Sequence, residues 1–213
     1  MYPDVTFVAR GTGVRALTPA GYDAAIDRVV PAAVELAGEG VEAVMVIGTS
    51  LTFYRGPEAH DRLLERLRAE TGLPVSTMSQ AIIDALHELG AHRVAVATAY
   101  IDVVNARLRE LLEYHGLEVT ALRAFRISEF GDGIIRRSAE EIVELAVESV
   151  AETERADAVL ISCGGLQTLP AIAPIEARTG LPVVTSTQAA LRDALRLAGR
   201  DSRIGGYGRL LAG

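Results

Sequence analysis

The only cysteine of the chain, Cys163, follows a mostly apolar run at residues 157–162 and precedes a pair of glycines. An apolar run bounded by glycines predicts a buried strand, and open α/β sheets bind their ligands at the carboxyl ends of such strands. A thiol at this place can exchange a proton with a bound ligand. We therefore expect the chemistry of the protein at Cys163.

A second stretch has the same build. Residues 41–47 are mostly apolar and lead into Gly48, Thr49 and Ser50. When the two runs are aligned, Gly48 stands at the place that Cys163 occupies in the other run. The sequence therefore repeats itself, with a cysteine at only one of two equivalent places.

This asymmetry separates reactions that need two acid/base groups from those that need one. Racemisation takes a base on one face of a planar intermediate and an acid on the other, so it suits two cysteines. Loss of CO₂ can form the same kind of planar enediolate, which a single acid then protonates on one face. Cys163 is our candidate for this acid. The alternative is that Cys163 is a small buried core residue, as most free cysteines are.

An enediolate needs hydrogen-bond donors, and three side chains near strand ends can supply them. Thr49 and Ser50 lie where a strand opens towards a helix, so their hydroxyl and N–H groups can converge on an anion. Tyr100 follows the run at 93–98 and offers a phenol. The alternatives are that Thr49 and Ser50 cap a helix and that Tyr100 is a packing residue.

Alternating strand and helix patterns predict the elements that hold these residues. Strands are expected at 4–8, 42–47, 74–75, 93–98, 117–125, 158–162 and 182–183. Helices are expected at 19–38, 57–70, 78–89, 101–115, 139–153, 168–178 and in a segment ending at 197. Such alternation implies right-handed crossovers and parallel sheets covered on both faces.

A further repeat supports a duplicated unit. Residues 179–183 repeat the sequence Thr-Gly-Leu-Pro-Val of residues 71–75, and each copy leads into Ser and Thr residues and then an Ala- and Leu-rich helix. We predict an α/β fold of two pseudo-symmetric lobes, each a parallel sheet flanked by helices. The first lobe takes residues 1–92 and 200–213, and the second takes 93–199. The active site is expected in the cleft between them, with Gly48 and Cys163 on opposite walls.

Composition excludes several classes of protein. The 213 residues carry a net charge of −7 with scattered Lys and Arg, so the chain has no basic stripe for nucleic acid or for an anionic membrane. No apolar run is long enough to span a bilayer, and the amino terminus has no signal pattern. We expect a cytoplasmic monomer that binds a small molecule, with neither nucleic acid nor a membrane as partner.

No metal and no cofactor are expected. The four histidines, His60, His87, His92 and His115, lack ligand spacing, and their places on predicted helices and turns suggest surface residues. The chain also lacks a dinucleotide fingerprint and a phosphate-binding loop. One cysteine cannot form an internal disulfide.

Four motifs carry a resemblance to a known family. Residues 48–56, 97–102, 162–165 and 206–210 resemble the arylmalonate decarboxylase family of the aspartate/glutamate racemase superfamily, which also contains maleate isomerases. Racemising and isomerising members generally carry a cysteine on each wall, whereas the decarboxylases carry glycine on the first wall and cysteine on the second. The chain follows the decarboxylases.

The resemblance implies cofactor-free decarboxylation of 2-aryl- or 2-alkenyl-malonates to chiral monocarboxylic acids. It places the retained carboxylate against Thr49, Ser50 and Tyr100 and against backbone N–H groups that include those of Cys163 and Gly164. It also places Val14, Leu17 and Leu51 in an apolar pocket for the departing carboxylate, although these three residues suit simple core packing equally well.

The chain departs from the family in two places. The segment around Phe130 and Gly133 differs from the family pattern, which leaves the range of substrates open. The chain also begins at Met1 without the family's first strand and proline-bearing loop, so either a truncation or a rebuilt first lobe is expected. Two other functions remain open: a one-base isomerase or racemase of the same fold, and a two-lobed module that binds small carboxylates.

Overall fold

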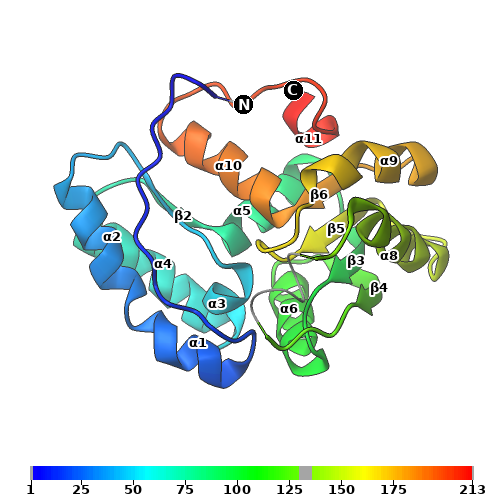
Figure 1. Ribbon diagram of the computed structural model, residues 1–213, viewed down its shortest axis with the longest axis horizontal. Helices are drawn as coiled ribbons and strands as arrows, with labels where there is room; N and C mark the ends of the chain where they lie inside the picture. Colours follow the sequence, from blue (N-terminus) through cyan, green and yellow to red (C-terminus); the bar gives the residue numbers. More distant parts are fainter. Residues whose placement is uncertain (1, 130–135, 213) are drawn as a thin grey trace.

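Two parallel sheets organise the chain in the computed structural model, which describes residues 2–129 and 136–212 (Figure 1). The first sheet pairs β1 (Val44–Val46) with β2 (Val75–Thr77). The second has the order β4-β3-β5-β6, formed by Glu118–Ala124, Arg93–Thr98, Ala158–Ser162 and Val183–Thr185 respectively. Neighbouring strands run parallel throughout. The predicted α/β fold with two parallel sheets is confirmed.

Helices cover both sheets. They are α1 (Pro19–Ile26), α2 (Val29–Gly38), α3 (Thr49–Phe53), α4 (Pro57–Thr71), α5 (Met78–Glu88), α6 (Asp102–Tyr114), α8 (Ala139–Ala151), α9 (Leu169–Thr179), α10 (Ser186–Leu197) and α11 (Arg209–Ala212). Helices α2 and α4 pack on the first sheet, and α8 and α9 pack on the second. Helices α5 and α10 pack against each other between the two groups, as Figure 1 shows.

The duplicated sequence has the same local structure in both copies. Thr71 and Thr179 each donate a hydrogen bond of 2.7 Å to the carbonyl of the residue four positions earlier. The glycine that follows each threonine takes the left-handed conformation that ends α4 or α9. Thr77 and Thr185 then cap α5 and α10 through their side chains. The repeat therefore builds one strand and one capped helix in each half.

A single hydrophobic core joins the two sheets. Val46 and Val75 of the first sheet belong to the same cluster of buried side chains as Val96 and Leu160 of the second. The chain ends lie close together, because the Tyr2 hydroxyl donates to the Ser202 carbonyl. The lobe boundaries given above stay a prediction.

Two local expectations were wrong, and two short helices were missed. The helix expected over 19–38 is interrupted, because α1 ends at Ile26 and α2 begins at Val29. Pro31 explains the break. In a continuous helix its ring would clash with the carbonyl of residue 27, and it has no N–H to donate to that carbonyl. Residues 4–8 form no strand, because nothing in the described chain pairs with them as a neighbouring strand, and Phe7 is 61% exposed. Short helices α3 and α11 were not expected.

Among residues 2–129 and 136–212, none of the helices has the length and apolar character that crossing a bilayer requires.

Candidate functional site

Cys163 lies directly after β5, which is flanked on both sides by β3 and β6. Its side chain is only 3% exposed. Burial raises the pKa of the thiol, although the N–H groups of Gly165 and Leu166 oppose this effect. The thiol therefore keeps its proton at neutral pH, which suits a proton donor.

Gly48 begins the corresponding turn after β1. Its φ of 140° is a conformation that residues with a side chain rarely adopt. The turn leads into α3, whose first residue, Thr49, donates a hydrogen bond of 3.0 Å from its hydroxyl to the Ser186 hydroxyl. Ser186 begins α10 directly after β6, so this bond brings the ends of the two sheets together. Ser50 follows in α3 and is also buried.

Tyr100 lies between these two turns. Its side chain is buried, and its hydroxyl is 3.4 Å from the Ser162 hydroxyl. Burial, followed by the nearby Cys163, raises the pKa of the phenol, whereas the Ser162 and Thr49 hydroxyls lower it. The phenol is therefore neutral and near both the cysteine and the first residue of α3.

A hydrogen-bond network fixes the backbone around Tyr100. Its N–H donates to the Thr98 hydroxyl oxygen at 3.2 Å, and its carbonyl accepts from the Asn105 amide at 3.0 Å. The Thr98 hydroxyl in turn donates to the Asn105 carbonyl oxygen at 2.7 Å. These buried bonds hold the first turn of α6 onto the end of β3, which fixes the position of the phenol.

Tyr22 of α1 is a further polar residue at this place, and it was missed from the sequence. Its side chain is fully buried, and its hydroxyl makes no hydrogen bond within the described part of the chain. Burial raises the pKa of this phenol, Ser50 lies near enough to lower it, and Cys163 contributes a smaller increase. The helix start at Thr18 and Pro19 could be predicted, but nothing in the spacing singled out Tyr22.

The three apolar residues expected in the pocket belong to the hydrophobic core. Leu17 and Leu51 are buried, and the partly buried Val14 packs against the same core. A side chain at Gly164 would come within 2.9 Å of the Met78 sulfur, so the turn after Cys163 closely approaches α5. Phe130 and Gly133 lie outside the described residues.

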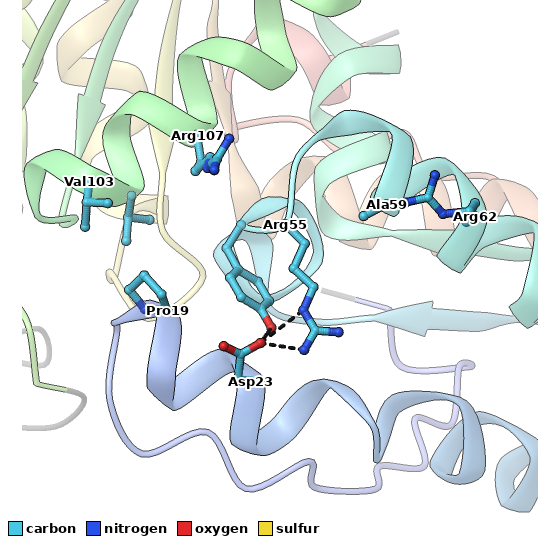
Figure 2. A pocket seen from close by; sticks show the side chains of 9 residues that line it. Pro19, Asp23, Arg55, Ala59, Arg62, Val103 and Arg107 are labelled. Atoms are coloured by element: carbon cyan, nitrogen blue, oxygen red, sulfur yellow. Dashed lines mark hydrogen bonds and ion pairs between the residues drawn. The ribbon is translucent and has the colours of Figure 1, made fainter.

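Two pockets lie elsewhere on the protein. A pocket of about 510 Å³ is lined by Pro19, Asp23, Tyr54, Arg55, Ala59, Arg62, Val103, Val104 and Arg107 (Figure 2). Figure 2 shows the Arg55 guanidinium pointing to the Asp23 carboxylate. The Arg55 Nε donates a hydrogen bond of 3.0 Å to Oδ1 of that carboxylate. Neither this pocket nor the adjacent one of about 330 Å³ is lined by Cys163, Thr49 or Tyr100. Arg55 is therefore tied to a carboxylate in a separate pocket.

The histidines correct another expectation. His60 is fully buried, because the first turn of α4 packs towards β2, where its Nε2 is 2.8 Å from the Thr77 hydroxyl oxygen. Burial lowers the pKa of His60 to about 4. His115 is half-buried, and His87 and His92 are exposed as expected.

Comparisons with known proteins agree with the motifs. A family model described as arylmalonate decarboxylase matches residues 1–211. The arylmalonate decarboxylase of Bordetella bronchiseptica is 44% identical over 211 residues, which cover 99% of this chain and 88% of that protein. A maleate isomerase of Pseudomonas putida is 29% identical over 202 residues, covering 91% of this chain and 78% of that one.

A solved structure gives the same result. It is a mutant arylmalonate decarboxylase in the liganded form, in which cysteine replaces a glycine and serine replaces a cysteine. It aligns with a TM-score of 0.96 and 43% identity, over 99% of this chain and 90% of that one.

Proposed function

Because the chain belongs to the arylmalonate decarboxylase family, we propose that it releases CO₂ from 2-aryl- or 2-alkenyl-malonates without a cofactor. The product is a chiral monocarboxylic acid. One observation carries the proposal: the only cysteine of the chain is a buried thiol, whose pKa burial raises, beside Tyr100 at the end of β5. The equivalent position after β1 is Gly48, so a second thiol is missing there.

The retained carboxylate binds to hydrogen-bond donors in this proposal. Thr49, Ser50 and Tyr100 supply hydroxyl groups, and backbone N–H groups of Ser50, Cys163 and Gly164 complete the site. The Thr49 hydroxyl turns its one proton from Ser186 to the bound carboxylate. When the bond to the departing carboxylate breaks, its electron pair moves onto the retained group and gives an enediolate. Preorganised donors stabilise this charge more in the transition state than in the substrate, and one such donor is typically worth about 3–4 kcal/mol.

The departing carboxylate lies against apolar side chains. It receives no hydrogen bond from Val14, Leu17 or Leu51. Loss of CO₂ is therefore favoured, because it removes a desolvated negative charge from this part of the site. The nearest arginine in the sequence motifs, Arg55, forms an ion pair with Asp23 instead. This pairing supports an apolar environment for the second carboxylate.

Cys163 ends the reaction by giving its proton to the α-carbon of the enediolate. The thiolate that remains takes a proton from water after product release, which balances the reaction. Because the thiol reaches only one face of the planar intermediate, one enantiomer forms. We also propose that the enzyme acts as a cytoplasmic monomer, which rests on its composition alone.

A second candidate is an isomerase like the maleate isomerase relative. Release of CO₂ from phenylmalonate by the parent and by its Cys163→Ser variant distinguishes the two. The decarboxylase proposal expects CO₂ from phenylmalonate. It expects one enantiomer of the monocarboxylic acid when the α-carbon carries a second substituent. The Cys163→Ser variant should give little of either product. Absence of CO₂ together with conversion of maleate to fumarate would favour the isomerase. A folded parent that binds malonates without converting them would be a carboxylate-binding module.

A further inference from the structure

A second group of potential ligands lies between α4 and α6, apart from the cysteine site. His60 and Asp61 come from the first turns of α4, and His115 follows the last residue of α6. One ligand atom from each of these three side chains lies within 4.8 Å of the other two. The sequence hides this group because His60 and His115 are far apart along the chain.

Two imidazole nitrogens in this group lack hydrogen bonds. His60 Nδ1 and His115 Nε2 are both buried and have no partner among residues 2–129 and 136–212. The Asp61 carboxylate does not satisfy His60, because its oxygen is 3.7 Å from Nδ1, too far for a hydrogen bond. Buried polar atoms without partners are costly, so these two nitrogens call for a ligand that accepts their lone pairs.

The surroundings hold the side chains in the required orientation. His60 Nε2 is 2.8 Å from the Thr77 hydroxyl oxygen, to which it can donate. That oxygen also accepts from the Gln80 N–H at 3.0 Å, and its two lone pairs allow both bonds. When Nε2 carries the proton, the lone pair of Nδ1 is free. Histidines that bind metal ions are oriented in the same way, through a hydrogen bond from the other ring nitrogen.

Asp61 and His115 are also held from outside. The Tyr114 hydroxyl donates to Asp61 at 3.4 Å. His87 Nε2 lies 3.0 Å from the His115 carbonyl oxygen and steadies the backbone at the end of α6. The Asp61 side chain is 41% exposed, so an ion can enter from solvent on that side.

We propose that His60 Nδ1, His115 Nε2 and the Asp61 carboxylate bind a Zn²⁺ ion. Two imidazoles and a carboxylate are a common ligand set for this ion, with a water molecule in the fourth position. Ligand atoms about 2 Å from a tetrahedral ion lie about 3.3 Å apart, so a pair at the 4.8 Å limit must close by about 1.5 Å. The Asp61 side chain is exposed, so its rotation can bring the carboxylate closer to the two imidazoles.

The ion would link α4, which packs on the first sheet, to α6, which packs on the second. It lies outside the cysteine site and takes no part in the proposed decarboxylation. We therefore expect the ion to stabilise the contact between the two sheets. It should raise Tm and leave the rate of the chemical step unchanged.

The test titrates Zn²⁺ into the untagged, chelator-treated full chain by calorimetry and follows Tm. The parent should bind one equivalent and show a higher Tm with Zn²⁺. Asp61→Asn and His115→Gln should each weaken binding by at least ~100-fold, since changes to outer partners alone cost about 10–100-fold. Asp61 is exposed and His115 is only half-buried, so both variants should fold even if His60→Gln does not.

His92→Gln is the matched control, because His92 is an exposed histidine outside the group. It should bind Zn²⁺ as the parent does. The proposal is overturned if the parent binds no Zn²⁺, or if Asp61→Asn and His115→Gln bind it as tightly as the parent. It is also overturned if His92→Gln loses as much affinity as they do.

Discussion

The Thr49 hydroxyl donates a hydrogen bond of 3.0 Å to the Ser186 hydroxyl, and both groups are buried. Thr49 opens α3 after β1, and Ser186 opens α10 after β6, so the bond joins the strand ends of the two sheets. Cys163 and Tyr100 lie at the ends of β5 and β3, on the same edge of the second sheet. The arrangement gathers a thiol, a phenol and several hydroxyl groups from both halves of the chain.

Replacing Cys163 by alanine should abolish most product formation, because the enediolate then lacks its acid. General acids contribute about 10²–10⁴-fold to rate, so we expect a loss in that range. CO₂ release and chiral product are measured together, with thermal unfolding as the control for folding. A folded variant that keeps most of the parental rate would remove Cys163 from the mechanism.

Loss of a donor should lower kcat more than it raises KM. Thr49→Ala and Tyr100→Phe each remove one hydroxyl from the developing oxyanion, and we expect kcat to fall by about 10²–10³-fold. Ser186→Ala is the control for Thr49, because it removes the same hydrogen bond and leaves the Thr49 hydroxyl in place. If kcat is unchanged and only KM rises, the hydroxyls merely anchor the substrate.

Tyr22→Phe separates packing from catalysis at a residue without a hydrogen bond. A buried hydroxyl that lacks a partner costs about 1–3 kcal/mol, so its removal should leave the free energy of unfolding unchanged or increase it. We expect kcat to fall by ~10-fold or more if the phenol donates to the charge that develops beside Ser50. Unchanged kcat in a variant of equal stability would make Tyr22 a packing residue.

The thiol should stay protonated well into alkaline pH. Burial raises the pKa of Cys163, so the neutral acid persists above the ordinary cysteine value of about 8.5. We expect kcat/KM to fall through the loss of this acid only above that pH, and iodoacetamide to react slowly at pH 8 because little thiolate is present. Rapid alkylation at pH 8 that abolishes activity would show that the thiol is exposed or its pKa lowered.

Local sequence patterns predicted the parts of the fold that depend on local interactions. The threonine caps of α5 and α10 and the glycines after α4 and α9 follow from side-chain and backbone preferences of single residues. The resemblance and the repeat drew attention to Thr49, Tyr100 and Cys163, whose side chains the structure places near one another.

Features that depend on tertiary packing were missed. In the sequence His60 is an ordinary polar residue of the predicted helix. In the fold β2 covers it, and His115 joins it only because α6 ends there. Tyr22 is one turn into a predicted helix, but its burial depends on the packing of α1 against α3 and on the Tyr54 ring. The break before α2, in contrast, could have been predicted from Pro31.

The proposed mechanism requires Gly48 and Cys163 to lie on opposite faces of the substrate. Moving the only cysteine, as Gly48→Cys combined with Cys163→Ser, places the acid after β1 instead of β5. The φ of 140° at Gly48 disfavours a side chain, and an added Cβ would lie 3.4 Å from that of Leu51.

The most direct measurement is therefore the enantiomeric composition of the acid that this double variant makes from a prochiral disubstituted malonate. Thermal unfolding of the variant and its rate of CO₂ release establish that it is folded and active. The proposed mechanism predicts the opposite enantiomer from that of the parent, because the proton reaches the other face of the enediolate. The same enantiomer from a folded, active variant would contradict the two opposed faces on which the mechanism rests.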